Sequence, residues 1–147
     1  MAAWLVSVFA LMAADDSRII LLETKDAKIE GGGRYDDTNG YKCIRDWKTT
    51  NVVARWNFDV PAKGSYRVLL TYACPRDGDG SEIEVNVGTQ RANGLTESTG
   101  NWTTFKEFDL GPVLLRRPAA TELSVKATRA AHGSVWDLRS VKLVREE

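Results

Sequence analysis

The chain has 147 residues, which is enough for one domain with its own hydrophobic core; 43% of them are hydrophobic and 27% charged, as in ordinary globular proteins. Twenty basic and twenty acidic side chains give a net charge of zero, and the sequence pI is about 6.6. Nucleic acids and anionic membranes are bound by clustered surplus cations, so this balance argues against both as partners. We expect a neutral ligand instead.

The N-terminal stretch MAAWLVSVFALMAA, residues 1–14, is apolar and uncharged. It is too short to span a bilayer. Its apolar run and the small residues Ala13 and Ala14 are typical of a secretory signal, although no basic residue precedes Arg18. An N-terminal element packed on the domain is the alternative. We expect residues 1–14 to be a signal or leader remnant, residues 15–147 to form one domain, and the protein to be secreted or periplasmic.

Short β-strands separated by turn residues follow the leader. The first is the apolar run IILLE at 19–23. A short polar stretch follows it, and three glycines at 31–33 then form a turn. VVARWNFDV at 52–60 alternates strictly, with its apolar side chains on one face, and Pro61 and Gly64 make the next turn. SYRVLLTYA at 65–73 alternates in the same way.

The second half continues the pattern. The expected strands are EIEVNVG at 82–88, TTFKEFDL at 103–110, TELSVKA at 121–127 and a closing strand within HGSVWDLRSVKLV at 132–144. About eight such strands predict an all-β fold, a two-sheet antiparallel β-sandwich with jelly-roll connections. In the closing strand Arg139 shares one face with Val141 and Leu143, and Lys142 lies on the other face. Whichever face of this strand is buried, it therefore includes a cation.

Residues for catalysis are scarce. His132 is the single histidine and lies in a glycine-flanked loop, which argues against a catalytic Cys–His pair. Acidic residues are numerous, but no pair is singled out as a glycosidase couple. Asp77-Gly-Asp79-Gly-Ser-Glu82 resembles the beginning of a calcium loop without the remaining ligand spacing, and we interpret it as a hairpin loop.

Four aromatic residues lie beside turn residues, where a flat ring at a loop edge can stack on the apolar face of a sugar. Apolar capping of the open ends of the sandwich is the alternative. These residues are Tyr35, Trp47, Trp102 and Trp136. The two cysteines, Cys43 and Cys74, lie in apolar contexts and are either buried free thiols or one disulfide.

The order of the motifs resembles a carbohydrate-binding module. The matching segments cover about residues 19–144 and are LLETKDAKIEGG, CIRDWKTTNVVARWNFDVPAKGSYRVLLTYAC, GSEIEVNVG, STGNWTTFKEFDLGPVLL, TELSVKA and VWDLRSVKL. They are similar to families six and thirty-five, which are galactose-binding-like jelly rolls, and the details most resemble modules appended to bacterial fucosidases and related glycoside hydrolases. The resemblance implies non-catalytic binding of polysaccharide or oligosaccharide, with a separate glycoside hydrolase as a possible partner.

The family's structural calcium has two glutamates on the first strand and an aspartate in the last. In this sequence those positions are Glu23, Lys25 and Arg139, so two of the three acids are replaced by cations. Since Ca²⁺ needs several oxygen ligands, we expect no calcium and no other cofactor. We expect Arg139 to take the place of the metal and to reach Glu23, with extension into solvent as the alternative.

The resemblance also implies a ligand site. Family-six modules hold a sugar between a tyrosine after the first strand and a later tryptophan, and an amide before the last strand receives a hydroxyl. Tyr35, Trp102 and Asp137 occupy comparable positions, with an acid replacing the amide, and we add Trp136 as a fourth residue.

We therefore expect an exported, non-catalytic module that binds a neutral glycan. The alternatives are a structural or protein-interaction sandwich whose sugar site has decayed and, third, a small glycan-active enzyme. The first two differ in whether Tyr35, Trp102 and Trp136 form one exposed patch.

Overall fold

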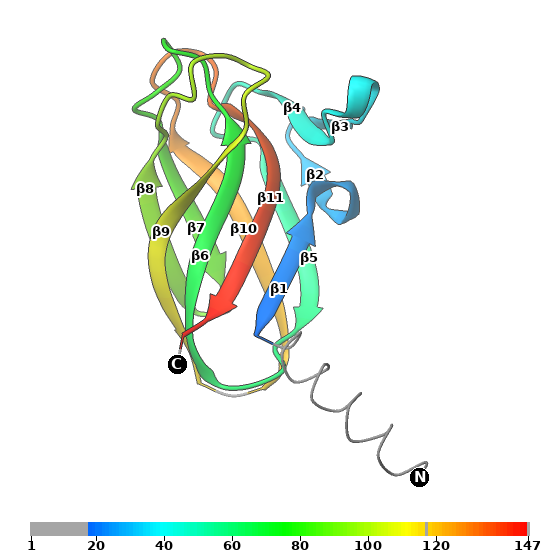
Figure 1. Ribbon diagram of the computed structural model, residues 1–147, viewed down its shortest axis with the longest axis vertical. Coiled ribbons are helices and arrows are strands. Elements are labelled where there is room, and N and C mark those ends of the chain that lie inside the picture. Colours follow the sequence, from blue (N-terminus) through cyan, green and yellow to red (C-terminus); the bar gives the residue numbers. More distant parts are fainter. Residues whose placement is uncertain (1–17, 117, 147) are drawn as a thin grey trace, which may run out of the picture.

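The computed structural model describes residues 18–116 and 118–146, and they form a sandwich of two antiparallel sheets (Figure 1). The expected leader at 1–14 lies outside the described residues. Sheet A consists of β1 (Ile19–Glu23), β3 (Arg34–Asp36), β4 (Cys43–Trp47), β6 (Gly64–Ala73), β9 (Lys106–Leu115) and β11 (Trp136–Arg145). Sheet B consists of β2 (Lys28–Glu30), β5 (Val53–Asp59), β7 (Glu82–Val87), β8 (Gln90–Leu95) and β10 (Ala120–Arg129).

Successive strands cross repeatedly between the sheets: β5 and β6 lie in opposite sheets, as do β9 and β10, and β10 and β11. Such crossing connections make a jelly roll and limit exposed edges. The predicted all-β sandwich is therefore confirmed. The expected hairpin loop at 77–82 is wrong, because residues 74–81 join β6 of sheet A to β7 of sheet B.

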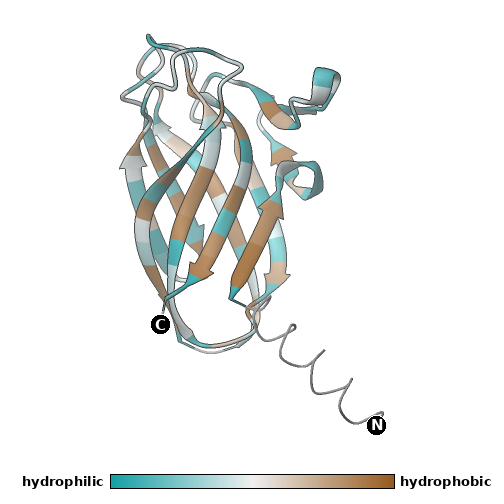
Figure 2. Cartoon of the chain, viewed as in Figure 1, coloured by the Kyte–Doolittle hydropathy of each residue, from teal (hydrophilic) through white to brown (hydrophobic). Residues whose placement is uncertain are grey.

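The core fills the space between the sheets. On β6 the alternating residues Tyr66, Val68, Leu70 and Tyr72 are all buried, as the alternation predicts. Apolar and polar residues alternate along most strands in Figure 2. Each large apolar side chain removed from water contributes about 1.5–3 kcal/mol, which makes this layer the main stabilising feature of the domain.

A β-bulge at Arg139 settles which face of the closing strand is buried. In the pairing of β11 with β6, Leu138 lies opposite Tyr72 and Ser140 lies opposite Thr71, so Arg139 is the extra residue. Leu138 and Val141 are both fully buried although they are three residues apart. The bulge therefore shifts the phase of the strand, and Arg139 belongs to neither regular face.

The end of the sandwich at the top of Figure 1 carries the loops 74–81, 96–105 and 130–135, together with β3 and β4. We call it the loop end. β4 pairs with the start of β11, and β1 pairs with its remainder. The strand order therefore brings segments from the beginning and the end of the chain together there.

Cys43 and Cys74 are buried free thiols, and burial raises the pKa of each to about 11. They are part of the core and are poor nucleophiles at neutral pH. In the described part of the chain no helix has the length and apolar character needed to cross a membrane.

Candidate functional site

The hairpin of β3 and β4 divides the loop end into two hollows. Arg34 of β3 lies opposite Arg45 of β4, and both line the first hollow. The next residue, Tyr35, lines the second. Successive strand residues point to opposite faces, which explains the division.

The first hollow, which we call the tryptophan hollow, has a volume of about 230 Å³. It is lined by Arg34, Arg45, Asp46, Trp47, Lys48, Trp102, Ser134, Trp136 and Asp137. These residues come from the β3–β4 hairpin and the residue after it, the loops before β9 and β11, and the start of β11. Indole rings and charged groups thus face the same space, a mixture that suits a ligand with both apolar and hydroxyl surfaces.

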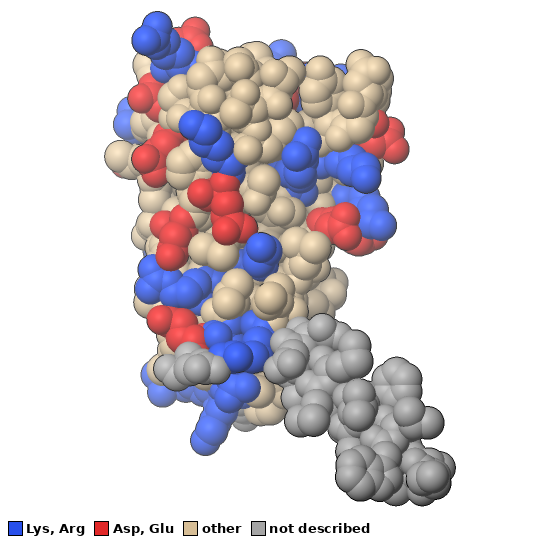
Figure 3. All heavy atoms as spheres, viewed as in Figure 1, with Lys and Arg blue, Asp and Glu red and all other residues tan. Residues whose placement is uncertain are grey.

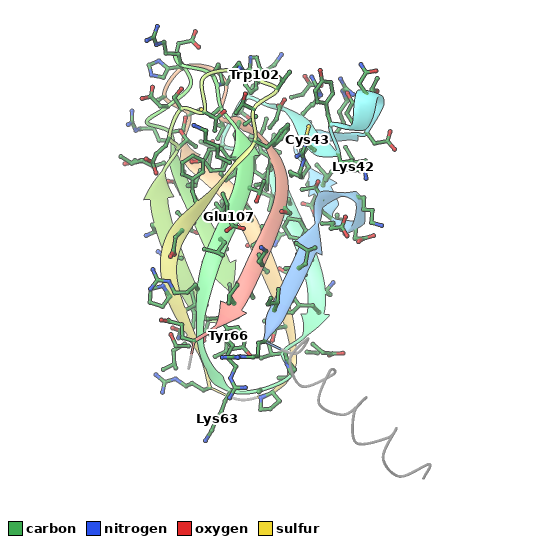
Figure 4. All side chains as sticks on the ribbon, viewed as in Figure 1. Lys42, Cys43, Lys63, Tyr66, Trp102 and Glu107 are labelled. Carbon is green, nitrogen blue, oxygen red and sulfur yellow. The ribbon has the colours of Figure 1, made fainter. Side chains whose placement is uncertain are left out.

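Trp102 supplies the exposed ring, with 36% of its surface accessible (Figure 4). The Asn101 carboxamide oxygen holds the turn that carries it, accepting hydrogen bonds from the backbone N–H groups of Thr103 and Thr104 at 2.9 and 2.7 Å. The Thr99 hydroxyl accepts a bond from the Cys74 backbone N–H at 3.0 Å and so ties this loop to its neighbour. The ring is therefore presented by an ordered loop.

Trp136 has a different role from the expected one. Only 1% of its surface is exposed, and its ring packs edge-on against Trp47 at 5.4 Å and against Tyr72 at 4.9 Å between centroids. The expectation that Trp136 offers a stacking face is wrong, because the phase of β11 turns its ring into the core. Trp136 and Trp47 form the wall of the hollow, and the indole N–H groups of both are buried without a partner in the described chain.

Asp137 is 95% buried, since 5% of its surface is accessible, yet it lines the tryptophan hollow. Within residues 18–116 and 118–146 its carboxyl group has no hydrogen bond or ion pair. Burial raises its pKa from 3.8 to about 6, while the nearby Arg45 guanidinium lowers it. A buried carboxyl without a partner is costly, so it is poised to accept hydrogen bonds from a ligand.

An ionic network forms the rim. The Arg34 Nε lies 2.8 Å from an Asp46 carboxylate oxygen, and the Arg45 Nε lies 3.1 Å from Asp36. The Arg45 guanidinium also stacks over the ring of Tyr41, with its central carbon 4.6 Å from the centroid. These contacts fix both arginines beside the hollow.

The second hollow has a volume of about 220 Å³ and lies against β1 and the middle of β11. We call it the cationic hollow; it is lined by Leu21, Glu23, Thr24, Lys25, Tyr35, Lys42, Arg139 and Ser140. The expectation that Tyr35 joins Trp102 is therefore wrong. Burial raises the pKa of the Tyr35 hydroxyl.

Arg139 does not reach Glu23, and that expectation is also wrong. Its Nε and one terminal nitrogen both donate to the Tyr41 carbonyl oxygen, at 3.0 and 2.8 Å, and its guanidinium lies 3.6 Å from the centroid of the Phe105 ring. The bulge directs the side chain there. β1 and β11 do pair, as expected, but through their backbones.

The residues at the family's calcium position do not fit a calcium ion. Among the described residues lining this hollow, Glu23 is the one carboxylate, and Lys25, Lys42 and Arg139 supply three cations. In the described part of the chain no group of three or more His, Cys, Asp or Glu residues is placed to hold a metal.

A larger hollow of about 430 Å³ lies at the opposite end of the sandwich, lined by residues such as Val60, Val87, Leu115 and Thr121. No aromatic ring or carboxylate is among its described lining residues. The loop end is thus the better candidate, although this other hollow is larger.

Sequence reasoning placed Trp102 and Asp137 at the loop end and the structure brings them together, but it missed Arg34, Arg45 and Asp46. Their signal is that charged residues adjoin an aromatic residue next to turns, in RYD and RDW. Alternation alone does not reveal which strands pair there.

No protein-family model matches the sequence, and no curated protein matches it. Solved structures do match. A family 35 carbohydrate-binding module from Clostridium thermocellum is 18% identical with a TM-score of 0.72, and the match covers 87% of this chain and 98% of that one. A module of Cellvibrio mixtus lichenase 5A in complex with cellotriose is 16% identical with a TM-score of 0.68, covering 87% of this chain and 98% of that one.

A β-(1,4)-mannanase from Podospora anserina, which carries a family 35 module, matches over 89% of this chain but only 28% of its own length, at 16% identity and a TM-score of 0.69. At such identities the likeness establishes the fold. The chain therefore has the jelly-roll fold of family six and family thirty-five modules, as the sequence motifs predicted.

Proposed function

We propose that this protein binds carbohydrate without transforming it, at the tryptophan hollow. The observation that carries the proposal is the exposed ring of Trp102 beside the buried, unpartnered carboxyl group of Asp137. The fold supports the proposal, since one matching structure is a module in complex with cellotriose.

Each group has a defined part in binding. The Trp102 ring stacks on the apolar face of a neutral sugar ring. Asp137 accepts hydrogen bonds from sugar hydroxyls, and these supply the partners that its carboxylate lacks among the described residues. Arg34 and Arg45, held by Asp46 and Asp36, donate from the rim.

Two arguments favour binding over catalysis. A glycosidase requires two carboxyl groups that act on opposite sides of one bond. Of the two carboxylates lining this hollow, Asp46 is engaged by Arg34 at 2.8 Å. His132 is exposed in its loop and lines neither hollow. The raised pKa of Asp137 is the observation that favours an enzyme, and incubation with nitrophenyl glycosides tests it; we expect no release of nitrophenol.

A structural or protein-interaction sandwich with a decayed sugar site is the second candidate. One observation favours it: Tyr35 and Trp136 do not join Trp102 on one exposed patch. The two candidates differ in whether any glycan binds through Trp102.

The test is a glycan array with neutral oligosaccharides, cellotriose among them, followed by calorimetry on each hit. We expect Trp102→Ala to weaken binding about tenfold or more, because truncation of a stacked aromatic anchor removes a large share of the affinity. Leu95→Ala is the matched control, since Leu95 is 57% exposed on β8 outside both hollows. Absence of binding to every glycan, or equal binding by Trp102→Ala, contradicts the proposal.

We propose further that the protein is exported and acts beside a glycoside hydrolase. The apolar run at residues 1–14 supports export. The mannanase, in which the matching part is about a quarter of a larger enzyme, supports the partnership. Detection of the chain in the culture medium or periplasm tests the first point.

A further inference from the structure

β1 differs from the other strands that lie at the edges of the two sheets. Among the described strands β11 is its single partner, so the other side of its backbone is open. Charged residues on an edge strand oppose pairing with another molecule. All the other edge strands have them: Lys28 and Glu30 in β2, Arg34 and Asp36 in β3, Arg91 in β8, and Lys106, Glu107 and Asp109 in β9. In β1, residues 19–22 are uncharged and include no proline, so this edge lacks that protection.

The outer face of β1 is apolar as well. Leu22 is buried and Ile20 packs against the core. Ile19 and Leu21 point the other way, and each is 52% exposed. β1 is brown over most of its length in Figure 2, and in Figure 3 the surface over β1 is mainly uncharged, whereas charged side chains cover β6 and β9. The outer face of an antiparallel sheet is normally polar, so β1 exposes apolar surface that the core of one molecule does not use.

The edge of a second copy of β1 complements this edge. Two copies of one strand pair antiparallel about a two-fold axis, since the same surface then meets itself. If both copies are to keep their inner faces on the same side of the joined sheet, the axis must pass through a residue of β1, and Leu21 is the middle one. Leu21 then lies opposite its own counterpart and Ile20 lies opposite Leu22. The facing pairs are apolar, and no like charges oppose each other.

The direction of β1 determines where the two candidate sugar sites lie in such a dimer. β1 begins beside the Arg18 carbonyl oxygen, which accepts a hydrogen bond from the Arg145 backbone N–H at 2.8 Å, and runs towards the loop end (Figure 1). In an antiparallel pair the second β1 runs the opposite way, so the two loop ends lie at opposite ends of the dimer. No residue of β1 is among the described lining of the tryptophan hollow, which therefore stays open in both copies.

We propose that β1 is a self-association edge, through which two copies of this chain pair antiparallel, and that the dimer joins two glycan chains, one at each end. The joining of glycans rests on the proposed carbohydrate binding, whereas the pairing of β1 does not. Five residues a side bury less than the roughly 1,200–2,000 Å² of a standard stable interface. We therefore expect a weak dimer, with a Kd on the order of 100 µM.

Sedimentation equilibrium of the full chain without glycan tests the pairing. From roughly 10 µM to roughly 1 mM the average mass should rise from that of one chain towards that of two. Leu21→Lys places like charges opposite each other at the axis and should raise the Kd at least about tenfold. Leu95→Lys is the matched control, since Leu95 is 57% exposed on the edge strand β8, and it should leave the Kd unchanged. Thermal melting followed by circular dichroism verifies that both variants are folded.

A mixture of the Leu21→Lys and Leu21→Glu variants tests the position of the axis. Each variant alone opposes like charges, whereas a mixed pair opposes a lysine to a glutamate. We expect the mixture to recover association that neither variant shows by itself. No recovery in the mixture contradicts an axis at Leu21.

Viscosity of the polysaccharide that corresponds to the strongest glycan-array hit, hydroxyethyl cellulose in the case of cellotriose, tests the joining of glycans. The unaltered protein should raise the viscosity, and Leu21→Lys should bind the same glycan without that effect. A chain that remains monomeric at every concentration, or Leu21→Lys that associates as strongly as the unaltered protein, overturns the self-association edge. A dimer that leaves the viscosity unchanged overturns the joining of glycans. If no glycan binds, the proposed function fails, while sedimentation still decides the pairing.

Discussion

Among the residues of the candidate site, Asp137 makes the stability of the folded protein depend on pH. Its pKa rises from 3.8 to about 6 on folding because burial penalises the charged form. The carboxyl group therefore binds its proton more tightly in the folded state than in the unfolded state. As the pH rises from about 4 to about 6, ionisation of this group lowers the free energy of unfolding. Above that window the cost is constant and amounts to about 3 kcal/mol.

Replacement of Asp137 by Asn should therefore raise the free energy of unfolding at pH 7.5 by up to about 3 kcal/mol and have little effect near pH 4. Urea denaturation at the two pH values measures the difference. Asp59→Asn, which removes one exposed carboxylate, is the matched control. An equal effect of Asp137→Asn at both pH values contradicts the assigned cause.

The same substitution separates function from stability. An amide can both donate to and accept from a sugar hydroxyl, whereas the carboxylate only accepts. The fold thus retains a destabilising acid at the site, which is the pattern expected where a side chain serves binding and not packing.

At the scale of elements, the glycine turn between β2 and β3 sets the position of the hairpin that separates the two hollows. Gly31 and Gly32 both have positive φ, 84° and 106°. A Cβ on Gly31 would lie 1.9 Å from the carbonyl oxygen of Asn51, while a Cβ on Gly32 meets nothing within 4 Å. Only Gly31 therefore combines backbone strain with a backbone clash.

We expect Gly31→Ala to lower the free energy of unfolding by about 2–4 kcal/mol and to weaken glycan binding, because the hairpin must move. Gly32→Ala should cost about 1 kcal/mol, from backbone strain alone. Chemical denaturation and calorimetry of both variants check this. If the two variants lose equal stability, the close approach to Asn51 is not what requires glycine.

Much of the sheet structure could be predicted from the sequence, since β1, β5, β6, β7, β10 and β11 follow expected runs. β9 begins and ends later than expected, at Lys106 and Leu115, because pairing with β6 carries it through Gly111 and Pro112. β8 was missed, since QRANGL has no apolar alternation and becomes a strand by pairing with β7. Tertiary pairing overrides weak local preference there.

The site was harder to predict than the sheets. Trp102 and Asp137 were chosen from the family resemblance, and the structure brings both to the tryptophan hollow. Trp136 was misplaced because alternation cannot reveal a bulge, and the bulge at Arg139 sets which side chains of β11 point inward. Tyr35 was misplaced because it points to the opposite face of β3 from Arg34, which lines the tryptophan hollow. The separation of the two hollows likewise depends on the β3–β4 register, which no local pattern encodes.

At the scale of the whole molecule, backbone pairing and packing attach the first described strand to the sandwich. Five residues of β1 pair with β11, and the Trp56 indole N–H of sheet B donates to the Glu23 carbonyl oxygen at 2.8 Å. The described residues that line the position where the family has calcium include three cations and one carboxylate. Hydrogen bonds and packing therefore join the first strand to both sheets.

We accordingly propose that calcium plays no part in stability. The melting temperature should be the same within about 1 °C in excess EDTA and in millimolar CaCl₂, because a ligand that binds only the folded state would raise it in a concentration-dependent way. Magnesium serves as the control for ionic effects. A rise specific to calcium would falsify this proposal.

Both described ends of the chain lie away from the loop end. The Arg145 backbone N–H donates to the Arg18 carbonyl oxygen at 2.8 Å, so the two ends are neighbours at the bottom of Figure 1. An affinity tag or a chip linker attached beside either described end would consequently anchor the molecule at the end opposite the loop end. Both hollows would then face the solution. Immobilised protein should thus retain full glycan capacity whichever end carries the linker.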